Sequence, residues 1–362
     1  MPVGPTVHPE DLLFVRHAVP SDTASGEELT FGGLSAAYVL SSGAWILGKE
    51  NIYVGQDEIN TSVSVLIGCS GWSYEDWVGR FYPVALAKKK EEWLRYYASY
   101  FSTVEINSTF YHPPNEFMVN GWIKKGQAFK SFEYSVKMPQ QVTHETLSNG
   151  EADKAAVLAT AFEGHCIKPL ADNGLFGSGL IQLSPSFRNG DGSIRQLRTV
   201  LEALDTDKYR YAVEFRHRSW LDEVKGKLDP PVAKLLAELN VANVIVDGPD
   251  LPMVRDITAD HAYLRLHGRS RETWSDDERE EDAHISRSDY LYSEEELSIW
   301  KEAIEKLDGL TGSVRVYFNN NGRAKGAKNA FQLMDMMSIP HREKEISVQD
   351  QTTLGNFLML QR

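Results

Sequence analysis

The sequence predicts an α/β fold, a (β/α)8 TIM barrel preceded by an N-terminal extension. From residue 63 onward, strand-like and helix-like segments alternate with short connections, which is typical of parallel βαβ units. Within the strand-like segments, polar residues recur at alternate positions, as in Val104–Asn107 and Val213–Arg216. Helices cover the outside of such a barrel, so we expect the apolar residues to face outward and the polar residues to face the interior.

Eight segments have the pattern of strands, namely Val63–Cys69, Thr103–Asn107, Phe132–Lys137, Gly179–Leu183, Tyr211–Arg216, Ala242–Asp247, Ala262–His267 and Val314–Asn319. Helical spacing of apolar residues occurs between them, at Ala87–Tyr100, Glu116–Gly126, Lys154–Ile167, Ile194–Leu204, Pro231–Leu239, Glu294–Leu307 and Ala327–Met337. We expect a helix after each of the eight strands. A doubly wound open sheet is the alternative, but Gly68–Trp72 lacks the GxGxxG spacing that its first turn would carry.

Length and composition limit the class of protein. The 362 residues suffice for one large domain and an appendage. A net charge of −13 argues against unspecific binding to nucleic acid or to an anionic membrane. It is compatible with a locally basic pocket. The chain has no apolar run of membrane-spanning length, and residues 1–11 do not resemble a secretion signal. With two cysteines and no CxxC pair, we expect neither a disulfide framework nor a thiolate zinc site, and a cytoplasmic protein.

The predicted organisation has three parts. Residues 1–60 show weak, mixed signals and form an N-terminal extension, residues 61–340 form the barrel domain, and residues 341–362 form a C-terminal tail. An acidic insertion at 270–292 follows the seventh strand. Such a charge run is typical of a solvated loop. A lid is the alternative interpretation, because loops after barrel strands border the site.

One short segment of the extension resembles a different family. Phe14–Ala18, followed by Leu29, Thr30 and Gly33, is similar to the start of a histidine phosphatase, in which an Arg-His pair supplies a phosphate-accepting histidine. That fold needs an α/β domain of its own, and residues 40–60 leave no room for one. The barrel interpretation is therefore preferred.

Candidate site residues are the polar and aromatic groups at the strand ends, where functional groups of this fold lie. The candidates for catalysis are Glu105, Lys137, Glu214, Asp247 and His267. The candidates for substrate binding are Trp72, Asn107, Tyr111, Gln182, Arg216, Arg265 and Asn319. The carboxylates and the histidine suit acid–base chemistry or metal ligation, with His267 as the proton shuttle.

Three acids and three bases oppose each other in this set. Lys137, Arg216 and Arg265 can neutralise Glu105, Glu214 and Asp247. Two interpretations follow: the six groups form a self-satisfied network, in which they neutralise one another without a ligand, or the bases bind an anion. We favour an anion, because amide and backbone donors at Asn319–Asn321 would add to the cations. We favour a metal-free site for the same reason, since three basic groups beside the acids disfavour a metal cation.

Motifs in one order from residue 67 onward resemble the YecE-like family, also called domain of unknown function 72. They are Ile67–Tyr74, Phe81–Pro83, Val104–Tyr111, Ser135–Pro139, Thr143–His144, Gln182–Phe187, Glu214–Trp220, Asp247, Arg265–Arg269, Tyr317–Asn320 and Asn329–Ala330. The resemblance implies a TIM barrel, and it implies neither an assigned activity nor a cofactor. It does not extend to residues 1–60 or explain the acidic insertion.

The sequence thus predicts an enzyme, a hydrolase or an isomerase, that uses acid–base or metal-assisted chemistry on a small anionic or polyhydroxylated substrate. The alternative is a non-catalytic binding protein for a small metabolite or a nucleic-acid end. The number of titratable groups at the strand ends favours the enzyme.

Overall fold

The computed structural model describes residues 64–222, 226–249, 254–269 and 289–346, and the backbone of three short strands before them. The chain divides into two compact units, Met1–Thr61 and Ser62–Arg362. The first unit contains the strands β1 (Tyr38–Val39), β2 (Ala44–Leu47) and β3 (Asn51–Val54), which form an antiparallel sheet in that order. The phosphatase-like segment and most of the acidic insertion, residues 270–288, lie outside the described residues.

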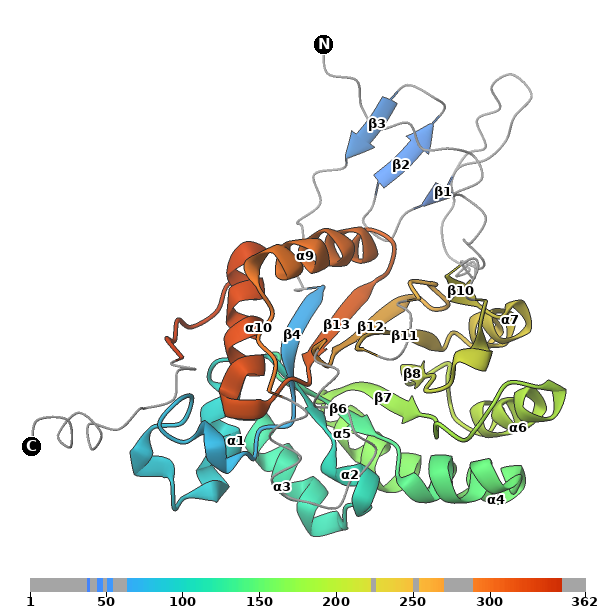
Figure 1. Ribbon diagram of the computed structural model, residues 1–362, viewed down its shortest axis with the longest axis horizontal. Coiled ribbons are helices and arrows are strands. Elements are labelled where there is room, and N and C mark those ends of the chain that lie inside the picture. The colour runs from blue at the N-terminus through green and yellow to red at the C-terminus, as the bar shows by residue number, and fades with distance from the viewer. Residues whose placement is uncertain are drawn as a thin grey trace, which may run out of the picture. The chain divides into compact units, whose positions relative to one another are not determined.

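The second unit contains a closed barrel of eight parallel strands, which confirms the predicted fold (Figure 1). The strands follow one another around the barrel in chain order, and β13 closes it by pairing with β4. They are β4 (Val65–Ser70), β5 (Thr103–Ile106), β6 (Glu133–Lys137), β7 (Phe176–Gln182), β8 (Tyr211–Glu214), β11 (Ala242–Asp247), β12 (His261–Leu266) and β13 (Ser313–Phe318).

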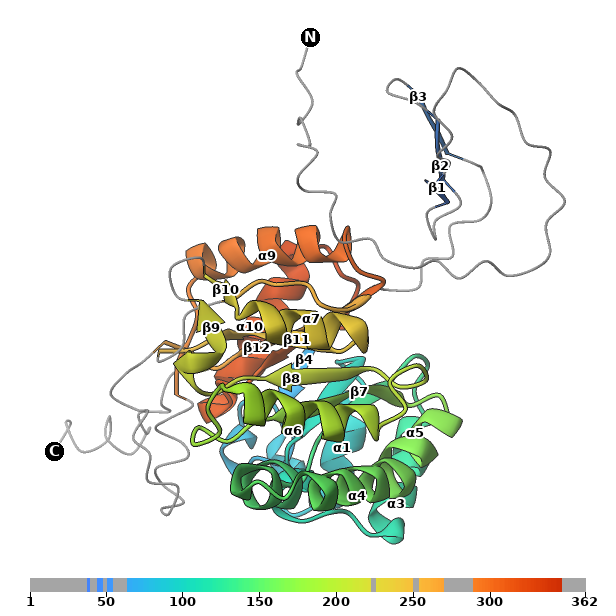
Figure 2. The same cartoon turned by 90° about the vertical axis from the view of Figure 1, so that its right-hand side faces the viewer.

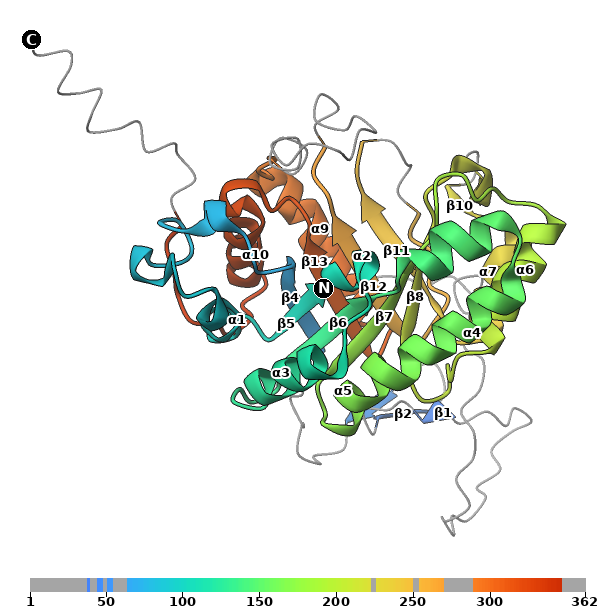
Figure 3. The same cartoon turned by 90° about the horizontal axis from the view of Figure 1, so that it is seen from below.

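Helices lie on the outside of these strands, as Figure 3 shows from below and Figure 2 shows for α6 and α7. They are α1 (Lys90–Ala98), α3 (Glu116–Gly126), α4 (Ala152–Phe162), α5 (Lys168–Asp172), α6 (Asp191–Glu202), α7 (Pro230–Glu238), α9 (Glu294–Asp308) and α10 (Lys325–Met336). The short helix α2 (Ser108–Tyr111) instead lies at the strand ends, where its Phe110 contacts Lys137. Two π-helical turns, Gln141–Thr146 and Glu163–Ile167, follow β6 and α4. Among the described residues, no helix has the length and apolar character needed to cross a membrane.

The expectation of a helix after every strand is wrong for β11. The described residues between β11 and β12, 248–249 and 254–260, contain no helix. The chain there runs beside β11 and is held by side-chain hydrogen bonds. The Thr258 hydroxyl donates to the carbonyl of Val241 at 2.7 Å and accepts from the amide of Asn243 at 2.8 Å. These bonds satisfy backbone groups at the start of β11. A short hairpin, β9 (Leu221–Asp222) with β10 (Lys227–Leu228), follows β8.

The main apolar core fills the layer between the strands and the helices. Trp77, Trp93 and Trp300 are fully buried there. A second, smaller apolar cluster lies inside the barrel and is made of Leu180, Ala212, Ala242, Val244, Val246, Tyr263 and Tyr317. Most of it comes from β7, β8 and β11, so the interior is apolar on that side of the barrel.

The opposite side of the interior is polar. Nε of Arg315 donates to Oε1 of Glu133 at 2.7 Å, and its Nη2 donates to Oε2 at 2.8 Å, which makes a bidentate pair between β13 and β6. The Tyr317 hydroxyl lies 2.6 Å from Oγ1 of Thr103 and 2.8 Å from Oγ of Ser135. The polar residues predicted to face the interior of β5, β6 and β13 therefore satisfy one another beneath the strand ends.

The Arg315–Glu133 pair yields a prediction about stability. Their side chains are 4% and 14% exposed. We expect Arg315→Met to lower the free energy of unfolding by about 3–5 kcal/mol, because it leaves a buried carboxylate without a partner. The double variant Arg315→Met, Glu133→Gln should recover much of this loss in urea titrations, and a double variant as unstable as the sum of the single ones would contradict the expectation.

The division into two units yields a second prediction. If residues 1–60 add little to the barrel core, a chain lacking residues 1–58 should unfold in one cooperative transition with nearly the melting temperature of the full chain. Calorimetry of the two chains measures this. An insoluble or non-cooperative product would show that the barrel depends on the extension.

Candidate functional site

Arg265 is the centre of a buried hydrogen-bond network at the carboxyl ends of the barrel strands. It lies on β12 and is 1% exposed. Its Nε and Nη2 donate to the two oxygens of Glu105 at 3.0 and 2.8 Å, and its Nη1 donates to Oε2 of Glu214 at 2.6 Å. The Tyr263 hydroxyl also donates to Glu105, at 2.7 Å. One guanidinium therefore binds carboxylates from β5 and β8, neither of which pairs with β12.

Gln182 and Arg216 extend this network. Oε1 of Gln182 accepts from Nη2 of Arg216 at 3.1 Å and from Nη1 of Arg265 at 3.2 Å. Arg216 also forms an ion pair with Glu214. The side chain of Arg216 is 14% exposed, whereas both carboxylates are fully buried. Arg216 is therefore the charged member of the network that is most open to solvent.

The charges within the network balance. Burial opposes the ionisation of Glu214, but Arg216 and Arg265 outweigh it and hold the pKa of this carboxyl well below its usual range. Burial likewise disfavours the charged form of Arg265, and the carboxylates of Glu105 and Glu214 outweigh it, so the pKa of Arg265 is raised. Two carboxylates and two guanidiniums thus form a neutral group.

Lys137, at the end of β6, is a third cationic group, and the carboxylates of Glu214 and Glu105 act on it only through their charge. Its Nζ lies over the Phe110 ring, 3.9 Å from the ring centroid, and the residue is 8% exposed. Among the described residues, none forms a hydrogen bond or an ion pair with this amine. Burial, aided by the charges of Arg265 and Arg216, lowers the pKa of Lys137 to about 7. The amine is therefore close to half-protonated at neutral pH.

His267 lies just beyond the end of β12. Its Nδ1 is 2.9 Å from Nδ2 of Asn319, and its Nε2 is 3.5 Å from Nη1 of Arg265 and 3.9 Å from Oε1 of Glu214. Burial, followed by the charges of Arg265 and Arg216, holds the pKa of His267 well below its usual range. The imidazole is neutral, so it can accept a proton or offer a neutral hydrogen bond.

Two residues beside Lys137 are not among the candidate site residues, although both lie in motifs of the family resemblance. Phe110 belongs to α2, and His144 belongs to the π-helical turn after β6. Their rings are edge to face, with centroids 4.8 Å apart. Burial, followed by the charges of Lys137 and Arg216, lowers the pKa of His144 to about 4. Both residues lie past the strand ends, where alternation along a strand gives no signal.

The inward orientation predicted for Asp247 is wrong. Its neighbours on β11, Val244 and Val246, face the barrel interior, so Asp247 faces the helices. Its carboxylate accepts from Nε of Arg269 at 3.0 Å and from Nε1 of Trp300, on α9, also at 3.0 Å. The structure brings together Glu105, Lys137, Glu214 and His267 at the strand ends and leaves Asp247 outside them.

The remaining aromatic and amide candidates lie around the network. Trp72 is half-buried against the main core, and its carbonyl accepts a hydrogen bond from Tyr82. Tyr111 is 46% exposed and packs edge to face on Phe110, with ring centroids 5.1 Å apart. Oδ1 of Asn107 is buried and has no hydrogen-bond partner among the described residues. Trp72 and Tyr111 follow β4 and β5, as walls of a strand-end pocket would.

The sequence predicted that the asparagines after β13 would offer amide donors to an anion, and two of them donate to backbone carbonyls instead. Nδ2 of Asn320 donates to the carbonyl of Tyr290 at 2.8 Å, and Nδ2 of Asn321 donates to the carbonyl of Ser70 at 2.8 Å. These amide donors join loops to one another and are not available to a ligand. Asn319 differs, because it contacts His267 and so orients a site residue.

The described residues contain no group of three or more His, Cys, Asp or Glu side chains that could hold a metal ion. Both oxygens of Glu105 and Oε2 of Glu214 accept hydrogen bonds from Arg265. The guanidinium therefore occupies the positions in which these two carboxylates would ligate a metal ion.

Comparison with known proteins places this barrel in a family. The model described as protein of unknown function DUF72 matches residues 66–353. The chain belongs to the DUF72 family. UPF0759 protein YunF of Bacillus subtilis is 26% identical over 282 residues, which are 76% of this chain and 96% of YunF. UPF0759 protein YecE of Escherichia coli K12 is 26% identical over 183 residues, which are 51% of this chain and 59% of YecE.

Solved structures agree with this DUF72 assignment. A DUF72 family protein from Thermotoga maritima is 32% identical with a TM-score of 0.64, and the match covers 76% of this chain and 99% of that one. A DUF72 family protein from Enterococcus faecalis is 23% identical with a TM-score of 0.61 and covers 78% of this chain and 100% of its own. The second likeness supports the fold only. The predicted resemblance to the YecE-like family is confirmed.

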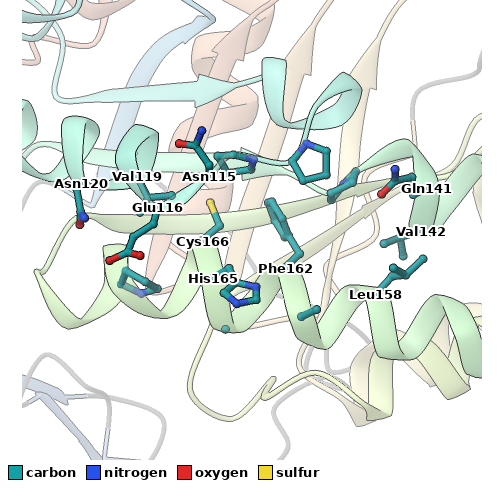
Figure 4. Close-up of a pocket in the computed structure, with 16 residues that line it drawn as sticks. Asn115, Glu116, Val119, Asn120, Gln141, Val142, Leu158, Phe162, His165 and Cys166 are labelled. Atoms are coloured by element: carbon teal, nitrogen blue, oxygen red, sulfur yellow. The ribbon is translucent and has the colours of Figure 1, made fainter.

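This DUF72 barrel also has a cavity of about 640 Å³ between α3 and α4, outside the strand-end network (Figure 4). Its walls are largely apolar and include Val119, Val142 and Phe162, with Glu116 and His165 among the few titratable groups. Cys166 also lines it, and burial raises the pKa of this thiol. The protonated thiol is a poor nucleophile, so this cavity is a weaker candidate for chemistry than the strand ends.

The environment of Lys137 yields a third prediction. The pKa of Lys137 is about 7 in the folded protein against an ordinary 10.5, so between these values the unfolded chain binds more protons. The free energy of unfolding, relative to that of Lys137→Met, should therefore rise as pH increases from about 7 towards 10.5. Urea titrations across this range measure the difference. Lys154→Met removes an exposed ammonium and is the matched control, and equal slopes for both variants would contradict the prediction.

Proposed function

We propose that this protein is an enzyme that performs acid–base chemistry on a small anionic or polyhydroxylated substrate at the strand ends. The observation that carries the proposal is the Lys137 amine, which lies beside a neutral Glu–Arg network and forms no ion pair with a carboxylate in the described part of the chain. A buried amine with a pKa of about 7 can give or take a proton at neutral pH.

The charge balance supports an anionic substrate. With Asp247 held by Arg269 and Trp300, three cationic groups face two carboxylates at the strand ends. When Lys137 is protonated the site carries one excess positive charge, and an anion would compensate it. Arg216 is the most accessible of the guanidiniums, so it is the proposed anion-binding group.

The other residues have supporting roles in this proposal. Glu105 and Tyr263 fix Arg265, and Arg265 fixes Glu214. His267, neutral and close to both Arg265 and Glu214, is the proposed partner of Lys137 in proton transfer. Metal-assisted chemistry is less favoured at these carboxylates, because Arg265 occupies them.

A non-catalytic protein that binds a small metabolite or a nucleic-acid end is the alternative. It would need the anion-binding guanidinium, and it would not need an amine that titrates near neutral pH. Lys137 therefore favours the enzyme.

Anion binding gives a fourth prediction. Millimolar phosphate, sulfate or a simple carboxylate should raise the melting temperature, because binding to the folded state stabilises it. Arg216→Ala should abolish the rise, since it removes the accessible guanidinium. Differential scanning fluorimetry at constant ionic strength, with chloride as the reference anion, measures both.

Arg198→Ala is the matched control, because Arg198 is exposed on α6 and is paired only with the surface carboxylates Glu202 and Glu238 in the described part of the chain. It should leave the anion effect intact. Melting temperatures that respond to none of these anions would mean that the network is self-satisfied, and the anionic substrate would be wrong.

A further inference from the structure

We propose that Lys137 forms an imine with the carbonyl carbon of its substrate, which is a small anion that also carries a ketone or an aldehyde. This inference rests on the proposed function, because it uses the same site and the same anion-binding group. It names the substrate class and assigns Lys137 a covalent role.

The surroundings of the amine favour a nucleophile over a structural cation. A buried structural lysine is ordinarily paired with a carboxylate or a carbonyl. Nζ of Lys137 instead faces the Phe110 ring, and no described residue accepts a hydrogen bond from it. Its lone pair, once the proton leaves, is therefore not directed at any described acceptor. Desolvation and neighbouring cations are the features that activate lysines towards carbonyl groups.

The neighbouring charges keep an anionic substrate oriented. Arg216 and Arg265 act on Lys137 electrostatically and both disfavour its protonation. Arg216 is 14% exposed and its charge acts on Lys137, so in this proposal it takes the anionic group while the carbonyl of the same small molecule meets the amine. The wall of Phe110 is apolar and limits water beside Nζ, which favours the imine over its hydrolysis.

The reaction balances without any further reagent. The Nζ lone pair attacks the carbonyl carbon, a C–N bond forms, and the carbonyl oxygen takes up a proton as the nitrogen loses one. The nitrogen lone pair then expels this oxygen as water, aided by a second proton, and the remaining N–H proton returns to the base. The sum is one amine and one carbonyl giving one imine and one water.

Two neutral imidazoles can carry these protons. The charge of Lys137 contributes to the low pKa of both His267 and His144, so both lie within its electrostatic reach. Each is neutral at pH 7 and can accept a proton from the attacking nitrogen or pass it to the departing oxygen.

Trapping with borohydride tests the imine. The protein is incubated with pyruvate, or with dihydroxyacetone phosphate, and sodium borohydride is added. Hydride goes to the imine carbon and a proton to the nitrogen, so the trapped protein gains the mass of the ligand less one oxygen atom. Intact-mass and peptide mass spectrometry should locate this adduct on Lys137. Acetone and dihydroxyacetone, which lack the anionic group, should be trapped at least tenfold less.

The variants make the test specific. Lys137→Arg and Lys137→Met should lose the adduct, with folding checked by the melting temperature, and Lys90→Arg, which changes an exposed lysine, should retain it. Arg216→Ala should lower trapping of the anionic carbonyl compounds towards that of the neutral ones. An adduct spread over surface lysines, or one that Lys137→Arg keeps, would overturn the imine.

Failure of the imine can be told from failure of the proposed function. If phosphate raises the melting temperature in an Arg216-dependent way and no carbonyl compound is trapped on Lys137, the anion site stands and the imine is wrong. If there is neither an anion effect nor trapping, both are wrong.

Discussion

The interaction on which the strand ends depend is the burial of Arg265 between Glu105 and Glu214. A guanidinium that is 1% exposed is tolerated only when its donors and the facing carboxylates are all satisfied. Because the partners come from β5, β8 and β12, this requirement fixes three strands that do not pair with one another. The guanidiniums of the same network disfavour the protonated forms of Lys137 and His267. The geometry of the strand ends and the charges that act on Lys137 and His267 therefore both depend on the burial of Arg265.

The sequence predicted the barrel and most of the polar interior because both depend on local patterns. Alternation along β5 and β12 placed Glu105 and Arg265 correctly, since each strand combines clear polar and apolar positions. It failed on β11, where Asn243 and Asp247 share the face opposite Ala242, Val244 and Val246, and alternation alone does not tell which face turns inward. What decides it is a pair of distant partners, 22 and 53 residues along the chain in Arg269 and Trp300.

That single error changes the interpretation of the site. By residue count, three acids match three bases, so the sequence leaves a self-neutralised network as the alternative to the anion site that it favours. In the structure Asp247 faces α9, where it accepts a hydrogen bond from Trp300, and no carboxylate of the described residues forms an ion pair with Lys137. Long-range pairing of this kind, and the contact of Lys137 with Phe110 in a helix beyond the strand, could not be read from periodicity. The chemistry of Lys137 therefore depends more on the burial and charges around its amine than on its place among the polar residues of the strand ends.

The position of the ligand's negative charge then decides what the site can do. An anion placed beside Nζ would stabilise the ammonium, raise the pKa of Lys137 and remove the nucleophile. An anion held at Arg216 neutralises a charge that already disfavours the ammonium, so it too raises this pKa, but less as its distance from Nζ grows. Arg265 is bound by two carboxylates and keeps its charge next to the amine whichever ligand enters. A substrate long enough to separate its anionic group from its carbonyl therefore suits this site, whereas a compact anion such as phosphate would act as an inhibitor.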